Sequence, residues 1–138
     1  MSRVVIYTDG GSRNNPGKAA SAAVIKDAAG NLQEICGKYL GIATNNVAEY
    51  TALLLAYESL VSSDKYKPEE TEINFYTDSN LIANQLTGRF RIKNPDLAKL
   101  ISQIKSYEQK FAKVTYQHVP REQNKEADFE VNRILDQN

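Results

Sequence analysis

Short apolar segments bounded by turn residues predict three strands in the first third of the chain. Residues 3–8 are rich in β-branched side chains, which is typical of a strand, and residues 19–26 and 32–40 are predicted to form two more. The glycine-rich segment 9–17 is expected to form the first turn, and residues 27–31 the second. Three consecutive strands joined by short turns favour an antiparallel meander.

Helical spacing begins near residue 46. Residues 46–61 predict a largely buried helix, because apolar residues recur at helical spacing and also occupy its other sides; the recurring residues are Val47, Tyr50, Leu53, Leu54, Tyr57 and Val61. The pattern then predicts a strand at 71–76, a short helix at 79–86, a helix that opens at Pro95 and whose apolar face reaches Phe111, a strand at 113–119 and a helix at 123–135. The order βββαβααβα predicts an α/β fold with a mixed sheet and helices on both faces.

Length and composition favour one soluble domain. The 138 residues fit one hydrophobic core, so residues 1–138 are interpreted as a single domain. No apolar run reaches the roughly 18 residues of a membrane span, no signal peptide is apparent, and the cytoplasm is the expected compartment. The single cysteine, Cys36, excludes an internal disulfide and metal sites built on paired cysteines. No protein partner is indicated, and a monomer is expected.

The net charge is zero, with 17 basic and 17 acidic residues. Nucleic-acid binders are usually basic, because contacts with phosphates supply most of their non-specific affinity. The balance therefore argues mildly against a nucleic-acid partner. That argument loses force if several acids are gathered in one metal site, since bound cations would invert the local field.

Four acidic residues occupy positions where each also has an ordinary structural explanation. Asp9 follows the apolar run 4–7, and taken alone it is best explained as a turn residue. Asp78 follows the strand 71–76 and could cap a helix, and Asp128 could be a solvated charge on the last helix. Glu49 is less ordinary because apolar residues flank it near a helix start, and a capping role and a functional role are equally supported.

Together the four acids predict a metal site. Ligands in mixed α/β sheets gather where strands end and helices begin, and Asp9 and Asp78 both follow strands. Two unit charges about 5 Å apart repel by roughly 3 kcal/mol at an effective dielectric near 20, so clustered carboxylates require cations or strongly raised pKa values. Oxygen ligands without a Cys or His cluster suit Mg²⁺ or Mn²⁺ better than Zn²⁺.

Longer motifs around these acids resemble type 1 ribonuclease H over almost the whole chain. The motifs are Tyr7-Thr8-Asp9-Gly10-Gly11-Ser12, Asn15-Pro16-Gly17, Thr44-Asn45-Asn46 with Glu49, Tyr76-Thr77-Asp78-Ser79, and His118 ten residues before Asp128. The first two are specific, whereas Thr-Asp-Ser alone is a weak signal. The resemblance implies a ribonuclease H-like five-stranded sheet of order 3-2-1-4-5, with strand 2 antiparallel to its neighbours.

The resemblance also implies an activity and roles for individual residues. Asp9, Glu49, Asp78 and Asp128 would hold two Mg²⁺ ions, with Mn²⁺ as a possible substitute, and the RNA strand of an RNA–DNA hybrid would be cut to 5′-phosphate and 3′-hydroxyl ends. Asn15 and Thr44 match residues that hold a phosphate of the DNA strand. Asn45, Asn46 and Asn80 match positions along the minor groove of the hybrid, where shape and the 2′-OH are recognised more than sequence.

Three departures from the family pattern set further expectations. A long basic insertion of many bacterial relatives is replaced here by residues 87–93, and the chain has no Trp. Phe129-Glu130 follows the last aspartate, where small or apolar residues are usual. His118 has the offset of the family's product-release histidine, while related short forms use an arginine at the position of Arg121, and either residue could assist turnover.

Three functions are weighed. A hybrid endonuclease is favoured over a nuclease of the same fold that also cuts double-stranded RNA. A nucleic-acid binding module that has lost catalysis is disfavoured, because a binder has no use for four acids that repel one another.

Overall fold

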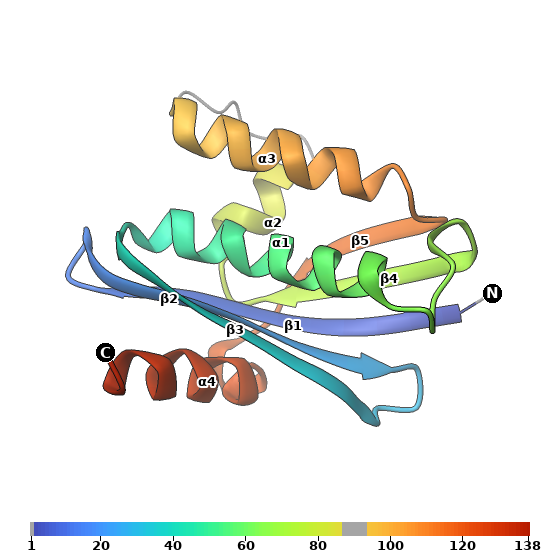
Figure 1. The fold of residues 1–138 in the computed structure, drawn as a ribbon, viewed down its shortest axis with the longest axis horizontal. Coiled ribbons are helices and arrows are strands. Elements are labelled where there is room, and N and C mark those ends of the chain that lie inside the picture. Colours follow the sequence, from blue (N-terminus) through green and yellow to red (C-terminus); the bar gives the residue numbers. More distant parts are fainter. Residues whose placement is uncertain (1, 87–93) are drawn as a thin grey trace.

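The five strands of the sheet lie in the order β3-β2-β1-β4-β5 in a computed structural model that describes residues 2–86 and 94–138 (Figure 1). The strands are β1 (Ser2–Arg13), β2 (Gly17–Asp27), β3 (Leu32–Ala43), β4 (Thr71–Thr77) and β5 (Lys113–His118). β2 is antiparallel to β1 and β3, whereas β4 is parallel to β1 and β5. The predicted meander, the strand order and the single antiparallel strand are confirmed.

Helices cover both faces of this sheet, as predicted. α1 (Asn45–Ser62), α2 (Asn80–Leu86) and α3 (Pro95–Glu108) lie on one face, and of the described helices α4 (Lys125–Asp136) is the one on the other face (Figure 1). Two short 3₁₀ turns, η1 (Pro68–Glu70) and η2 (Arg121–Gln123), precede β4 and α4. No helix of the described ranges has the length and apolar character to cross a membrane.

Two hydrophobic cores of unequal size hold the layers together. The larger lies between the sheet and α1, where Tyr50, Leu53, Tyr57 and Leu60 are at most 1% exposed and pack with residues from β1, β4 and α3. The smaller lies under α4 and consists of Ala20, Ala22, Val131, Ile134 and Leu135, with Tyr39 against it. The prediction for Val61 is wrong: it is 39% exposed, and Leu60 one position earlier completes the buried side of α1.

The first predicted turn is also wrong in extent. β1 continues through Gly10 to Arg13 and remains paired with β2, so only residues 14–16 separate these strands. The glycine at position 10 serves close packing, because a Cβ there would lie 2.3 Å from the carbonyl carbon of Ala48 and 2.4 Å from the amide nitrogen of Glu49. β1 and the start of α1 therefore touch through their backbones beside Asp9 and Glu49.

Several element ends differ from the sequence prediction. Thr44 is the N-cap of α1, and its hydroxyl accepts a hydrogen bond from the amide of Val47. Residues 121–123 form η2, so α4 begins at Lys125, two residues later than predicted.

Phe129 is 70% exposed and points away from the sheet, so this departure from the family pattern does not disturb the packing of α4. The departure at 87–93 lies outside the described residues.

Candidate active site

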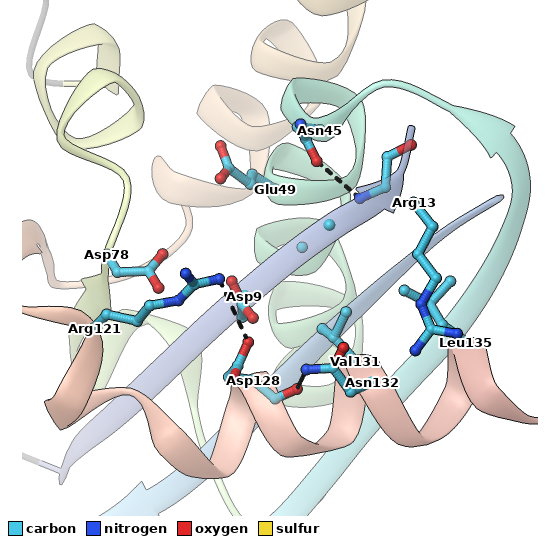
Figure 2. Close-up of a pocket in the computed structure, with 13 residues that line it drawn as sticks. Asp9, Arg13, Asn45, Glu49, Asp78, Arg121, Asp128, Val131, Asn132 and Leu135 are labelled. Atoms are coloured by element: carbon cyan, nitrogen blue, oxygen red, sulfur yellow. Dashed lines mark hydrogen bonds and ion pairs between the residues drawn. The ribbon is translucent and has the colours of Figure 1, made fainter. Parts of the chain in front are cut away.

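Four elements bring the four predicted acids to one open pocket at the end of the sheet. Asp9 lies within β1, Glu49 on α1, Asp78 directly after β4 and Asp128 near the start of α4 (Figure 2). All four line a cavity of about 490 Å³. The side chains of Asp9, Asp78 and Asp128 point toward one another, and that of Glu49 approaches from the α1 side (Figure 2). Acids separated by up to 119 positions in the chain are thus gathered by the topology of the sheet.

Asp9 has the most strongly raised pKa in the pocket. It is only 9% exposed, because β1 is the central strand and α4 covers it. Burial, the charges of Asp78 and Asp128 and a hydrogen bond with Asp128 together raise the pKa of the Asp9 carboxyl to about 8, against the lowering effect of the Gly10 amide. Without a cation, Asp9 therefore holds a proton at neutral pH.

Glu49 is the second acid of the pocket whose pKa is raised. Its pKa is raised to about 7, mainly by burial and further by the charge of Asp78, against the lowering effect of a hydrogen bond from Ser79. The capping explanation does not hold, because Thr44 caps α1 and the first turn of the helix contains no acid. Glu49 begins the second turn, and among the described residues its electrostatic partners belong to the segment that follows β4.

The pocket also receives cationic and amide groups. Arg121 of η2 approaches Asp128, with 4.0 Å between its Nη2 and Oδ1, and its side chain is 80% exposed. The side-chain oxygen of Asn45 accepts a hydrogen bond of 2.8 Å from the backbone amide of Ser12, and the backbone amide of Asn45 donates to Oδ1 of Asn15 at 3.1 Å. These bonds connect the start of α1 to the β1–β2 turn, so that Asn45 and Asn15 form one polar rim.

The remaining predicted residues do not line this pocket. Thr44 and Asn46 lie beside Asn45, and Asn15 reaches the rim only through its bond to Asn45. Asn80 is the first residue of α2 and is exposed. His118 is the exposed last residue of β5. Of the two candidates for assisting turnover, only Arg121 lines the pocket.

The donor set of the pocket fits a hard divalent cation. Its acids supply only oxygen ligands, and no Cys or His lines it, which suits Mg²⁺ or Mn²⁺. Within residues 2–86 and 94–138, no three Asp, Glu, His or Cys side chains are already grouped tightly enough to enclose an ion. The raised pKa values of Asp9 and Glu49 come mainly from burial and further from the neighbouring negative charges, and a bound cation would offset both effects.

Sequence reasoning missed several residues of the pocket. Arg13 ends β1 and pairs with Asp136 at the far end of α4, and Asn132 donates a hydrogen bond to the backbone oxygen of Asp128 (Figure 2). Asn132 could have been found from its position one helical turn after Asp128. Arg13 carried no such signal, because the segment was interpreted as a turn.

Comparisons with known proteins agree with this geometry. A protein family described as reverse transcriptase-like matches residues 7–134. The bifunctional protein Rv2228c of Mycobacterium tuberculosis is 39% identical over 135 residues, which are 97% of this chain and 36% of that protein. The ribonuclease HI of Halobacterium salinarum is 37% identical over 134 residues, 97% of this chain and 65% of that protein. The chain thus spans about a third of the first relative and less than two thirds of the second.

Solved structures give the same result. A crystal structure of RNase H1 from Halobacterium salinarum superposes with a TM-score of 0.90 and 36% identity, and the match covers 99% of both chains. A crystal structure of LC11-RNase H1 in complex with an RNA/DNA hybrid superposes with a TM-score of 0.84 and 39% identity, over 94% of each chain.

Proposed function

Because the chain belongs to the type 1 ribonuclease H family, we propose that it is a metal-dependent endonuclease that hydrolyses the RNA strand of RNA–DNA hybrids. Cleavage leaves 5′-phosphate and 3′-hydroxyl ends by a two-metal mechanism. Residues 1–138 act as one ribonuclease H domain, and the expected compartment is the cytoplasm.

The observation that carries this proposal is the convergence of Asp9, Glu49, Asp78 and Asp128 on one open pocket. Burial and the charges of neighbouring acids raise the pKa values of Asp9 and Glu49, and such perturbed carboxylates reduce stability unless they act on a ligand. A related protein in complex with an RNA/DNA hybrid supports the choice of substrate.

The four carboxylates would hold Mg²⁺ or Mn²⁺. When bound, two such ions supply positive charge that polarises an attacking water and stabilises the departing 3′ oxygen. Asp9 lies at the centre of the cluster, since both Asp78 and Asp128 act on it. Asp78 and Asp128, which are less buried, complete the set from the two sides of β1, and Glu49 completes it from α1.

The polar rim would bind the hybrid. Asn45 lies at the mouth of the pocket and keeps its side-chain amide nitrogen for substrate, because its oxygen is bonded to the Ser12 amide. Asn15 and Thr44 would hold a phosphate of the DNA strand, and Asn46 and Asn80 would extend the contact along the minor groove. Amides and hydroxyls suit this task, because a hybrid is recognised by its shape and by its 2′-OH groups.

Arg121 is the favoured candidate for assisting turnover. Its guanidinium lies beside Asp128 and is exposed, so it can reach a phosphate at the pocket without leaving η2. A guanidinium binds phosphate by two parallel hydrogen bonds, which suits it to hold or expel a 5′-phosphate. His118 would have to approach from the end of β5.

A cleavage assay tests the proposal. Purified protein is incubated with labelled hybrid, double-stranded RNA, single-stranded RNA or double-stranded DNA, each with Mg²⁺ and with chelator. Only the RNA strand of the hybrid should be cut, only with metal, and the products should carry 5′-phosphates. Equal cutting of double-stranded RNA would favour the broader nuclease, and tight hybrid binding without cleavage would favour a binding module.

A further inference from the structure

Asn124 is a buried side chain that the proposed mechanism does not use. It lies between η2 and α4, is 1% exposed, and comes four residues before Asp128. Its side-chain nitrogen donates a hydrogen bond of 2.9 Å to the backbone oxygen of Thr8, which immediately precedes Asp9. This bond joins residues 116 positions apart, between the central strand and the segment that carries Asp128.

The backbone of Asn124 is bonded to the other site residues. Its amide donates to the carbonyl of Arg121 at 2.9 Å and so closes η2. Its carbonyl accepts from the amide of Asp128 at 3.1 Å and so forms the first turn of α4. One residue is therefore bonded to Arg121, to Asp128 and to the residue before Asp9.

The oxygen of the Asn124 side-chain amide has no hydrogen-bond partner among the described residues. This atom, Oδ1, is buried. A buried unsatisfied acceptor reduces stability, and native proteins retain few of them. Nor does the side chain cap α4, although Asn is a favoured N-cap residue. Stability alone therefore does not explain an asparagine here, and the bond to Thr8 is the one hydrogen bond that its side chain makes among the described residues.

We propose that Asn124 is a positioning residue that sets the separation of Asp9 and Asp128. This inference rests on the proposed function, since it assumes that the two acids share a cation. The smaller core under α4 and exposed ion pairs, such as Lys26 with Glu126 and Arg13 with Asp136, are the other attachments of this helix. Within the described ranges, the bond from Asn124 to Thr8 is the buried polar attachment of α4 to β1 beside the carboxylates.

The test replaces Asn124 with leucine, whose side chain has the same number and branching of heavy atoms and cannot donate. Residues that orient metal ligands typically change metal affinity by about 10–100-fold when they are mutated. Asn124→Leu should therefore raise the Mg²⁺ concentration that gives half-maximal thermal stabilisation by about 10-fold or more. It should lower kcat by a similar factor. KM for the hybrid should stay within about twofold, because the buried side chain cannot touch substrate.

Asn74 offers a matched control. It is 7% exposed and does not line the pocket. Its side-chain nitrogen donates to Thr115 of β5 at 2.9 Å and to Glu72 of its own strand β4 at 3.0 Å. Asn74→Leu removes the same buried amide and should lower the melting temperature, while half-saturating Mg²⁺ and kcat stay at wild-type values. The comparison separates positioning from general destabilisation.

A second variant covers the case in which Asn124→Leu does not fold. Asn124→Ser leaves space for water and should show the same weaker Mg²⁺ response with a smaller loss of melting temperature. Unchanged half-saturating Mg²⁺ in a folded Asn124 variant would overturn the proposal, as would equal losses in Asn74→Leu. A wild-type protein that binds Mg²⁺ but cuts no hybrid would refute the proposed function and leave the Mg²⁺ titrations to decide the role of Asn124.

Discussion

Replacing Asp9 with asparagine should stabilise the protein when metal is removed by a chelator. The variant keeps the shape of the side chain and removes a buried group whose pKa rises from 3.8 to about 8. Each pKa unit corresponds to about 1.4 kcal/mol, so the displacement sets a ceiling on the penalty, which is lower at pH 7 and reaches about 6 kcal/mol at pH 8 and above. Side chains reorient and water enters the open pocket, so we expect about half of that, ~3 kcal/mol. For a chain of this length, that raises the melting temperature by about 10 °C.

The sign of the pH dependence follows from proton binding. Between pH 3.8, the ordinary pKa of the group, and its folded value of about 8, the folded wild-type protein holds a proton that the unfolded chain has lost. Stability therefore falls as pH rises through this window, because the unfolded state binds fewer protons than the folded state. The fall should be smaller in Asp9→Asn. It should not vanish, because Glu49, whose pKa is raised to about 7, still titrates there.

The assay is thermal unfolding in chelator at pH 5, 6, 7 and 8, followed by a Mg²⁺ titration. Asp64→Asn, at an exposed position of the loop after α1, is the control and should shift unfolding by less than about 0.5 kcal/mol. Mg²⁺ at tenfold above its Kd should stabilise the wild type by roughly 1.4 kcal/mol and the Asp9→Asn variant by less. An Asp9→Asn protein that melts at or below the wild-type temperature in chelator at pH 7 would refute the assignment of a strained carboxylate cluster.

Three further predictions use the same structure. Asp78→Asn should abolish cleavage while circular dichroism and hybrid binding stay nearly unchanged, and wild-type turnover would exclude Asp78 as a ligand. Gly10→Ala should destabilise the fold by about 3 kcal/mol in denaturant unfolding, because its Cβ would meet backbone atoms of α1 at 2.3–2.4 Å; Gly11→Ala is the control, since its Cβ would lie 3.7 Å from a methyl group. Arg121→Ala should lower kcat and keep the shape of the pH–rate profile, since arginine stays charged. His118→Ala should have a smaller effect, and the reverse ranking in steady-state kinetics would favour the histidine.

The order of the elements followed from the sequence because apolar runs and helical spacing indicate which segments are buried. The apolar run of β2 is buried on both faces of the sheet, with Ala20 and Ala22 in the smaller core and Ala23 and Ile25 in the larger, whereas the apolar residues of α1 recur at spacings of three to four toward the larger core.

Asp9 and Asp78 could be named because each follows an apolar run, and Glu49 because it lies within an apolar helix, whereas Asp128 carried little signal of its own. The motifs around them then indicated which alternative to prefer.

What the sequence did not reveal depends on contacts between distant segments. Gly10 is a glycine because of Ala48, and this contact is invisible to a local rule that interprets Asp-Gly-Gly as a turn. Val61 lies at a helical spacing from Tyr57 as good as that of Leu60, and only the direction of the sheet decides which is buried. The bond from Asn124 to Thr8 spans 116 positions, so no pattern near either residue indicates it.

The unequal cores on the two faces of the sheet have a consequence for heat resistance. Of the described helices, α4 is the last and the one that covers its face of the sheet, and the described buried residues of its core are five small or aliphatic ones. Segments with few buried contacts open at lower free energy than the rest of a protein, and they do so without global unfolding. Local opening of α4 would withdraw Asp128 from the pocket while the sheet and the three helices of the other face remain folded. Activity in this protein should therefore be lost on warming before its melting transition, and amides of α4 should exchange with solvent faster than those of α1.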